Sequence, residues 1–307
     1  MVAPLEDASV RVEKNRMREQ ALRHQAAMSI VNAMTVDVED YFQVQSLAKR
    51  FPRSIWDKRT TRVEQNTDRI LSLFADHGVK ATFFTLGWVA ERHRSLISRI
   101  VENGHELASH GYEHIRADQQ DRNAFRTDVR RTKRILEDVT GISVRGYRAA
   151  TFSIGKANLW AFEVLAEEGY AYSSSIYPIR HDYYGMPDAP RFPFRPLTNA
   201  NFLEVPISTI KVGGWNLPGG GGGYFRLLPY AWSKWSLKRI NRRDGQASVF
   251  YFHPWEIDPH QPRPERLDLK TRVRHYTNLD RMEARLSQLL RDFRWDRMDR
   301  VFVSTRP

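Results

Sequence analysis

The sequence contains no cysteine among its 307 residues. This absence excludes a disulfide framework and thiolate ligands, so a bound metal would need histidine and carboxylate ligands. No run of about 18 apolar residues is present, which predicts that no segment crosses a membrane. Residues 1–27 lack the apolar core of a signal peptide and predict a disordered leader, or a translation start that precedes the true one at Met28. Together these absences predict a cytoplasmic protein.

The charge of the chain is strongly positive, with 48 Lys and Arg against 36 Asp and Glu. The basic residues are spread along the chain and do not form one basic block with interleaved aromatics. We therefore expect no nucleic-acid partner. Hydrophobic residues make up 41% of the chain, which is enough apolar mass for a substantial core.

From residue 29 onward, short apolar runs alternate with segments of helical spacing, several of which end in glycine. The predicted helices span 62–77, 89–103, 120–139, 156–168 and 278–293. The predicted strands after the first apolar run span 81–86, 106–108, 144–147, 248–252 and 301–304. This alternation predicts an α/β fold with a parallel sheet, either a barrel or a doubly wound sheet. Residues 178–230, which include five glycines after Pro218, predict long loops over the sheet.

Polar residues follow several of these strands. The segment TVDVEDYF (35–42) places three carboxylates after the first strand, and SHGYEH (109–114) places two histidines four residues apart after another. Such a pair can face one way on a helical turn and bind one metal. Arg148 and His253 also follow predicted strands. In a barrel of parallel strands these positions meet at one face, where active sites form.

The residue types at this face predict a reaction class. Two histidines and one carboxylate leave a coordination position open, as in catalytic metal sites. A second carboxylate can accept a proton from water, and a protonated histidine can donate one to a leaving amine or alcohol. An arginine beside the base keeps it ionised. These residues predict a metal-assisted hydrolase of amides or esters.

The ordered motifs TVDVED, SHGYEH, GYRAATFS and FYFHPWE resemble those of NodB-type polysaccharide deacetylases (carbohydrate esterase family 4), over about residues 29–305. GGGGYFRLLPY (220–230), HPWEIDP (253–259) and HYTNLDRMEARL (275–286) resemble the subgroup found with exosortase/PEP-CTERM exopolysaccharide loci. The resemblance implies that residues 28–307 form a single NodB-like domain, a distorted (β/α) barrel with fewer than eight full units. It also implies a divalent metal, most often Zn²⁺, and removal of acetyl groups from an N-acetylated glycan. The implied setting is exopolysaccharide biosynthesis, in association with the synthesis machinery.

Carried over by residue, the resemblance makes Asp37 the base, Arg148 its partner, His253 the acid, and His110 and His114 metal ligands.

The sequence departs from the family pattern in three places. Val38 occupies the position of the family's metal-binding aspartate, so the carboxylate ligand must be Glu39 or Asp40. An extended strand favours Glu39, which faces the same way as the base, whereas a turn after the base would bring in Asp40. Ala149 and Ala150 follow Arg148 at positions where the family usually has prolines. Ser173 stands where relatives carry an aspartate, so any tuning of the acid histidine must come from elsewhere.

Two alternatives remain open from the sequence. The same site would serve an O-acetyl esterase or another amidohydrolase, and a non-catalytic glycan-binding protein of this fold would lack one of the catalytic residues. Aromatic residues are candidates for a sugar groove or for the core, and we expect Trp255 to pack beneath the site. The groove candidates are Tyr41, Phe42, Trp88, Trp215 and Tyr224.

Overall fold

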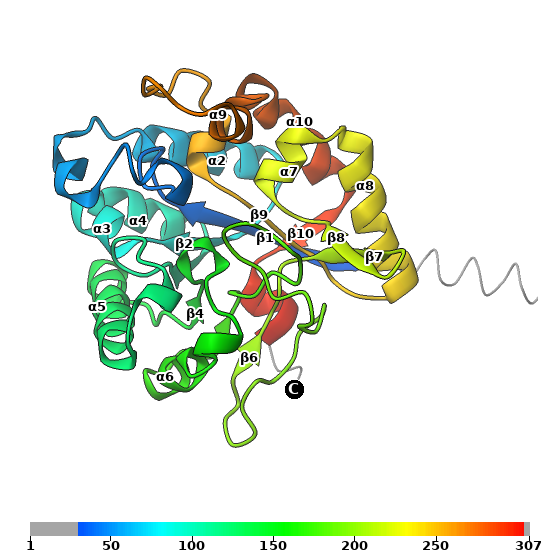
Figure 1. Ribbon diagram of the computed structural model, residues 1–307, viewed down its shortest axis with the longest axis horizontal. Coiled ribbons are helices and arrows are strands. Elements are labelled where there is room, and N and C mark those ends of the chain that lie inside the picture. The colour runs from blue at the N-terminus through cyan, green and yellow to red at the C-terminus, as the bar shows by residue number, and fades with distance from the viewer. Residues whose placement is uncertain (1–29, 304–307) are drawn as a thin grey trace, which may run out of the picture.

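The computed structural model describes residues 30–303, so the predicted leader at 1–27 lies outside the described residues. Helices surround a curved sheet that forms a half-barrel (Figure 1). Its strands are β1 (Val31–Val38), β2 (Thr82–Thr85), β3 (Glu106–Ser109), β4 (Gly146–Tyr147), β5 (Tyr172–Ser173), β6 (Leu203–Glu204), β9 (Val249–Phe252) and β10 (Arg294–Asp296). They run in the order β10-β1-β2-β3-β4-β5-β6, with β9 also paired to β1. Every pairing is parallel, and the predicted distorted (β/α) barrel with fewer than eight full units is confirmed.

Helices formed where the apolar spacing predicted them. These are α2 (Val63–Asp76), α3 (Gly87–Arg92), α4 (Arg94–Glu102), α5 (Arg122–Thr140), α6 (Ala161–Glu167) and α10 (Leu279–Asp292). The predicted helix 89–103 is divided because His93 adopts non-helical angles between α3 and α4. In α5, the Asp121 carboxylate accepts the first free backbone N–H groups, and Gly141 ends the helix in the left-handed conformation.

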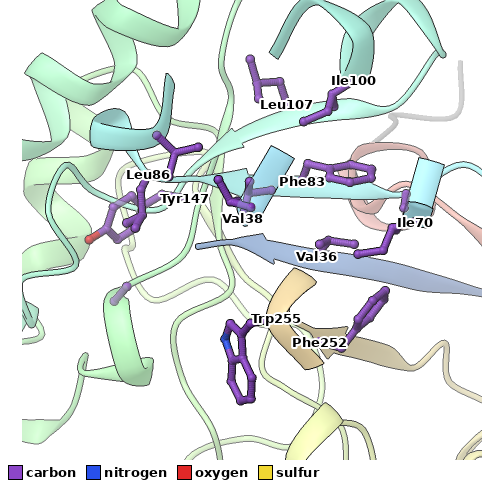
Figure 2. Packing of buried hydrophobic residues seen from close by; sticks show 14 of the residues in the cluster. Val36, Val38, Ile70, Phe83, Leu86, Ile100, Leu107, Tyr147, Phe252 and Trp255 are labelled. Carbon is purple, nitrogen blue, oxygen red and sulfur yellow. The ribbon is translucent and has the colours of Figure 1, made fainter. Parts of the chain in front are cut away.

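The outer face of the sheet forms the main core. Val36, Phe83 and Leu107 point from their strands towards the helices, where Ile70 of α2 and Ile100 of α4 pack over them (Figure 2). Since side chains alternate along a strand, their neighbours point into the barrel. That interior holds a second cluster.

The interior cluster indicates where the polar residues of β1 lie. Ala33, Phe84, Ala108 and Tyr251 belong to this cluster. Asp37 is the register partner of Phe84, so its side chain faces the same interior side. The alternation that fills the outer core with Val36 therefore carries Asp37 to the inner face.

Two predictions about the second half of the chain were wrong. The predicted strand at 301–304 is replaced by a π-helical turn, Asp299–Val303, whose apolar side chains pack on the interior cluster. The last strand is β10, which directly follows α10 and pairs with β1. The block 178–230 holds regular structure as well as loops: β6, an antiparallel hairpin of β7 (Thr209–Val212) and β8 (Trp215–Pro218), and α7 (Gly222–Leu227). Helices α8 (Tyr230–Arg239) and α9 (Leu269–Tyr276) were not predicted.

Within residues 30–303, none of the helices has both the length and the apolar character needed to cross a bilayer.

Candidate active site

A pocket of about 240 Å³ opens at the carboxyl ends of the strands. Asp37 and Glu39 reach it from the end of β1, His110 from the end of β3, and His253 from the end of β9. His114 joins them from the loop after β3. The structure therefore brings to one cavity the residues that the sequence had placed separately at strand ends.

Glu39, His110 and His114 form a cluster that fits a metal ion. One potential ligand atom from each residue lies within 4.8 Å of the others. Glu39 Oε2 is 2.9 Å from His114 Nε2, yet this oxygen is buried and has no partner with hydrogen-bond geometry among the described residues. His110 Nδ1 lies 2.8 Å from the Arg148 carbonyl, which can only accept, so Nδ1 carries the proton and Nε2 keeps a free lone pair. An orphaned carboxylate oxygen and an oriented imidazole are what a cation site requires.

The electrostatics place Glu39 and His110 in protonation states that can bind a metal. Burial by itself raises the pKa of Glu39, but the neighbouring histidines outweigh it and lower the pKa to about 2. Burial lowers the pKa of His110 to about 4, against the opposing field of the nearby carboxylates. At neutral pH the site therefore offers a carboxylate and a neutral imidazole, the forms that bind a divalent metal.

The two histidines do not share a helical turn, contrary to the reasoning from their spacing. They lie on a loop in which Gly111 and His114 both have positive φ, 75° and 53°. A Cβ at Gly111 would lie 3.0 Å from Asp128, so the turn needs glycine for its angle and its space. Arg53 donates to the His114 carbonyl at 3.0 Å and fixes the end of the loop.

The structure distinguishes between Glu39 and Asp40, the two candidates for the carboxylate metal ligand. Glu39 joins the histidines, whereas Asp40 turns to the start of α2. The Asp40 carboxylate accepts the backbone N–H groups of Tyr41, Arg62 and Val63, at 2.8, 2.6 and 3.0 Å. These bonds satisfy both oxygens of Asp40 and leave the cluster to Glu39.

Asp37 is held by a fully buried arginine. Arg148 Nη1 donates to Asp37 Oδ1 at 2.5 Å and to Thr35 Oγ1 at 2.9 Å. The other guanidinium nitrogens donate to the carbonyl and hydroxyl of Ser174, both at 3.1 Å, and the group lies 4.0 Å from the centre of the Phe84 ring. This ion pair fixes one oxygen of Asp37 and leaves its second oxygen facing the pocket.

His253 faces the carboxylates from β9. Its Nε2 lies 3.9 Å from Asp37 Oδ2 and 3.6 Å from Glu39 Oε1. Burial by itself lowers the pKa of His253, but the three surrounding carboxylates outweigh it and raise the pKa to about 9. The imidazole is thus protonated at neutral pH and can donate from Nε2.

Trp255 packs beneath the site, as the sequence suggested, and it also contacts Glu39, one of the three candidate metal ligands. Its ring stacks between those of His253 and His275, with centroid separations of 5.2 and 4.2 Å. Its Nε1 donates to Glu39 Oε1 at 3.3 Å, which orients the carboxylate. No pattern in the sequence indicated this long-range bond.

The aromatic candidates for a sugar groove separate into three groups. Tyr41, Phe42 and Trp88 are buried in the main core. Trp215 is 58% exposed on the β8 hairpin and does not line the pocket, whereas Tyr224 does.

Two residues at the rim of the pocket were not assigned a role from the sequence. His181 and Tyr184 line the pocket and stack at 3.9 Å, both from the block expected to be loops.

A parallel half-barrel with a His-His-Glu cluster, a buried Asp–Arg pair and a protonated histidine at its carboxyl face is an arrangement suited to metal-assisted hydrolysis. Comparison with known proteins shows which proteins this chain resembles. Residues 53–172 match the family model described as polysaccharide deacetylase, and residues 174–303 match a domain of unknown function (DUF3473).

Among curated proteins, a peptidoglycan-N-acetylglucosamine deacetylase from Bacillus cereus is 33% identical over 98 residues, 32% of this chain and 36% of that protein. A chitooligosaccharide deacetylase from Rhizobium leguminosarum is 33% identical over 70 residues, 23% of this chain and 33% of that protein. The chain thus spans about a third of the length of these two relatives. A candidate polysaccharide deacetylase structure from Mycobacterium smegmatis shares the fold, with a TM-score of 0.57, 22% identity, and coverage of 87% of this chain and 84% of that one.

These matches relate residues 53–172 of this chain to the polysaccharide deacetylases. The two matched segments contribute strands to one sheet, since β1 pairs with β2 of the first segment and with β9 and β10 of the second. The site also draws on both segments. His110 lies in the first, His253 in the second, and Asp37 in neither.

Proposed function

We propose that this chain is a metal-dependent hydrolase that removes acetyl groups from N-acetylated sugars of a glycan. The observation that carries the proposal is the convergence of the Glu39–His110–His114 cluster, Asp37 and His253 on one pocket. All the residue types that the chemistry needs are present, so a non-catalytic glycan-binding role is disfavoured.

The metal would be held by Glu39, His110 and His114, with Zn²⁺ suited to this set of nitrogen and oxygen ligands. When bound, a divalent cation supplies Lewis acidity that polarises a carbonyl oxygen and lowers the pKa of water. The buried, orphaned oxygen of Glu39 and the oriented imidazole of His110 support this ligand set.

The chain's own residues would move the protons. Asp37, held in place by Arg148, accepts a proton from the attacking water through its free oxygen. His253 then donates its Nε2 proton to the sugar nitrogen as the C–N bond breaks, which gives acetate and a free amine. The short separation of these two side chains, 3.9 Å, allows both to reach one acetamide group.

The substrate class is inferred from the relatives, whose names specify N-acetylglucosamine and chitooligosaccharide substrates. We further propose a role in exopolysaccharide biosynthesis, in the subgroup associated with exosortase/PEP-CTERM loci and in association with the synthesis machinery. This step rests on the motifs GGGGYFRLLPY and HPWEIDP.

The direct test is acetate release by the purified protein from N-acetylglucosamine oligomers. Chelation should abolish release and Zn²⁺ should restore it. Asp37→Asn and His253→Ala should each lower kcat by about 10²–10⁴-fold. Glu283→Gln, which changes a partly exposed carboxylate on α10, is the control and should retain wild-type rates. Full activity of Asp37→Asn would contradict the mechanism, and preference for O-acetylated sugars in a substrate panel would favour the esterase alternative.

A further inference from the structure

A buried carboxylate follows the catalytic histidine but has no role in the mechanism above. Glu256 lies in the short helical turn Pro254–Ile257 and is 1% exposed. Its Oε2 accepts the backbone N–H of His253 at 3.4 Å, and its Oε1 lies 3.7 Å from His253 Nδ1. The second distance is that of an ion pair and not of a direct hydrogen bond. His253 Nδ1 has no hydrogen-bond partner among the described residues, so Glu256 is the carboxylate that faces it.

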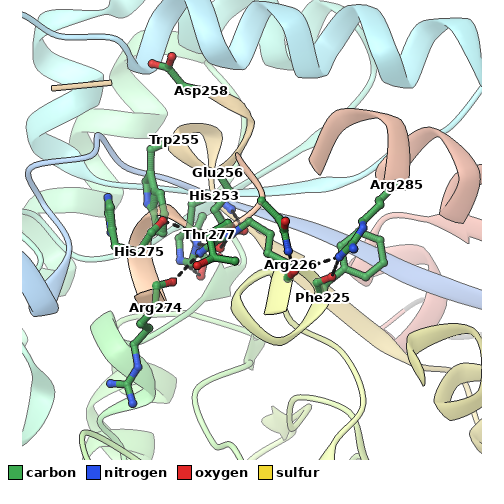
Figure 3. A network of polar contacts seen from close by, with 12 residues as sticks. Phe225, Arg226, His253, Trp255, Glu256, Asp258, Arg274, His275, Thr277 and Arg285 are labelled. Carbon is green, nitrogen blue, oxygen red and sulfur yellow. Dashed lines mark hydrogen bonds and ion pairs between the residues drawn. The ribbon is translucent and has the colours of Figure 1, made fainter. Parts of the chain in front are cut away.

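Glu256 is in turn held by a buried arginine from α7. Arg226 Nε lies 3.4 Å from Glu256 Oε1, and its other nitrogens donate to three backbone carbonyls (Figure 3). Those carbonyls belong to Arg274, His275 and Thr277, at 3.0, 3.1 and 2.7 Å. The Arg226 guanidinium is therefore fixed from the side opposite to Glu256 and cannot move away without losing these bonds.

The glycine run that the sequence displays after Pro218 makes this contact possible. A Cβ at Gly222 would lie 1.7 Å from Glu256 Oε2, and one at Gly220 would lie 2.3 Å from the Val249 carbonyl. Neither glycine has positive φ, so the requirement is for space and not for a special backbone angle. The run lets the start of α7 pack directly against β9 and the Glu256 carboxylate.

The burial of this pair is difficult to explain by stability alone. Taking two charges out of water costs about as much as their attraction returns, so a buried ion pair often gives no more stability than packed apolar residues. Asp258, two residues further on, is equally buried but pairs with Arg62 and does not contact the pocket. Glu256 differs from it in facing His253.

We propose that Glu256 is a positioning residue that orients His253 for proton donation, and that Arg226 and Gly222 keep Glu256 in place. With Nδ1 directed at Glu256, Nε2 is directed into the pocket, towards the nitrogen that leaves. This inference rests on the proposed function, because it assigns the orientation of the proposed acid.

The test compares two substrates that differ in their need for an acid. An N-acetylglucosamine oligomer releases an amine, which must be protonated, whereas 4-nitrophenyl acetate releases a stable phenolate. Glu256→Gln should lower kcat on the oligomer by about 10–100-fold with little change in KM. Its rate on 4-nitrophenyl acetate should stay within about threefold of wild type, because that leaving group needs no proton.

Asp258→Asn is the matched control, because it removes a carboxylate of equal burial from the adjacent part of the same segment. Any loss that it causes should fall equally on both substrates. Gly222→Ala, which pushes against Glu256 while keeping its charge, should reproduce the substrate-dependent loss of Glu256→Gln. Equal losses on both substrates for Glu256→Gln and Gly222→Ala would overturn the positioning role.

A second measurement covers the case in which the activity variants are poorly folded. In protein labelled with ¹⁵N-histidine, the His253 resonances, identified by their loss in His253→Ala, should report a changed protonation pattern of Nδ1 in Glu256→Gln and in the milder Glu256→Asp. An unchanged pattern in a folded variant would also overturn the proposal. If the wild-type protein releases no acetate from any glycan, the proposed function fails, whereas the ¹⁵N result still decides whether Glu256 orients His253.

Discussion

Replacement of Arg148 by methionine should show how much its ion pair with Asp37, the proposed base, contributes to the stability of the fold. Arg148 is fully buried, and it donates to Asp37 at 2.5 Å as well as to Thr35 and Ser174. Methionine fills much of the same volume but donates no hydrogen bond. The Asp37 carboxylate would then remain in the interior beside Phe84 without its directly bonded counter-charge, and the nearest remaining cation would be His253, 3.9 Å away.

The expected cost follows from the loss of this buried ion pair. Breaking a buried ion pair by removing one partner costs about 3–5 kcal/mol. For a chain of 307 residues, whose entropy of unfolding is about 0.6 kcal/mol/K, that corresponds to a fall in Tm of roughly 5–8 °C. The Thr35 hydroxyl still donates to the Phe250 carbonyl at 2.9 Å, so its contribution to the loss is small. Most of the cost should therefore be recovered when Asp37 is also made neutral.

The assay is a double-mutant cycle measured by urea unfolding with a chelator present, so that no cation compensates for the charge of Asp37. Arg148→Met should be more destabilised than the double variant with Asp37→Asn, with a coupling free energy of about 2 kcal/mol or more. A cost below about 1 kcal/mol for Arg148→Met would refute the reasoning. So would a double variant whose cost equals the sum of the two single costs.

Three further predictions concern the metal cluster and the opposite end of the barrel. Glu39→Gln should reduce bound Zn²⁺ well below one equivalent, as measured by elemental analysis after dialysis. Trp255→Phe, which removes the bond to Glu39, should weaken Zn²⁺ affinity by about 10–100-fold in a competition titration with a chelator. Burial and the charge of Asp299 raise the pKa of Glu106 from 4.5 to about 7 in the folded protein. The contribution of Glu106 to the free energy of unfolding is therefore fully present below about pH 4.5, and it is lost as the pH rises to about 7. Glu106→Gln should remove that decline in urea unfolding measured from pH 5 to 8, since Tyr172 can reverse its hydrogen bond to the new amide; an unchanged pH dependence would contradict this account.

The parts of the site that the sequence predicted are those governed by regular periodicity. The two-residue period of a strand carries Asp37 to the inner face and Val36 to the helices, and a parallel sheet brings strand ends together. His110 and His253 therefore converge with Asp37 even though they lie far apart in the chain. Helical spacing and terminal glycines likewise located α2, α5 and α10 to within two residues.

The parts that the sequence did not predict depend on loops and on long-range contacts. The choice of Glu39 over Asp40 follows from the start of α2, whose free N–H groups take up Asp40. The loop after β3 uses positive φ at Gly111 and His114, which a spacing of four residues does not reveal. The final strand was missed because its three residues, Arg294–Asp296, follow α10 without a break signal.

The support that we propose for His253 comes from a different part of the fold than the position at which relatives carry an aspartate. Ser173 stands where relatives carry an aspartate, and its hydroxyl donates to the hydroxyl of Ser175. The carboxylates within 4.0 Å of the His253 ring nitrogens are instead those of Asp37, Glu39 and Glu256. Of these, only Glu256 approaches Nδ1, and it fits only because position 222 has no Cβ. Glycine at 222 and glutamate at 256 therefore act together in the positioning that we propose for His253, which gives the conspicuous glycine run a role at the site.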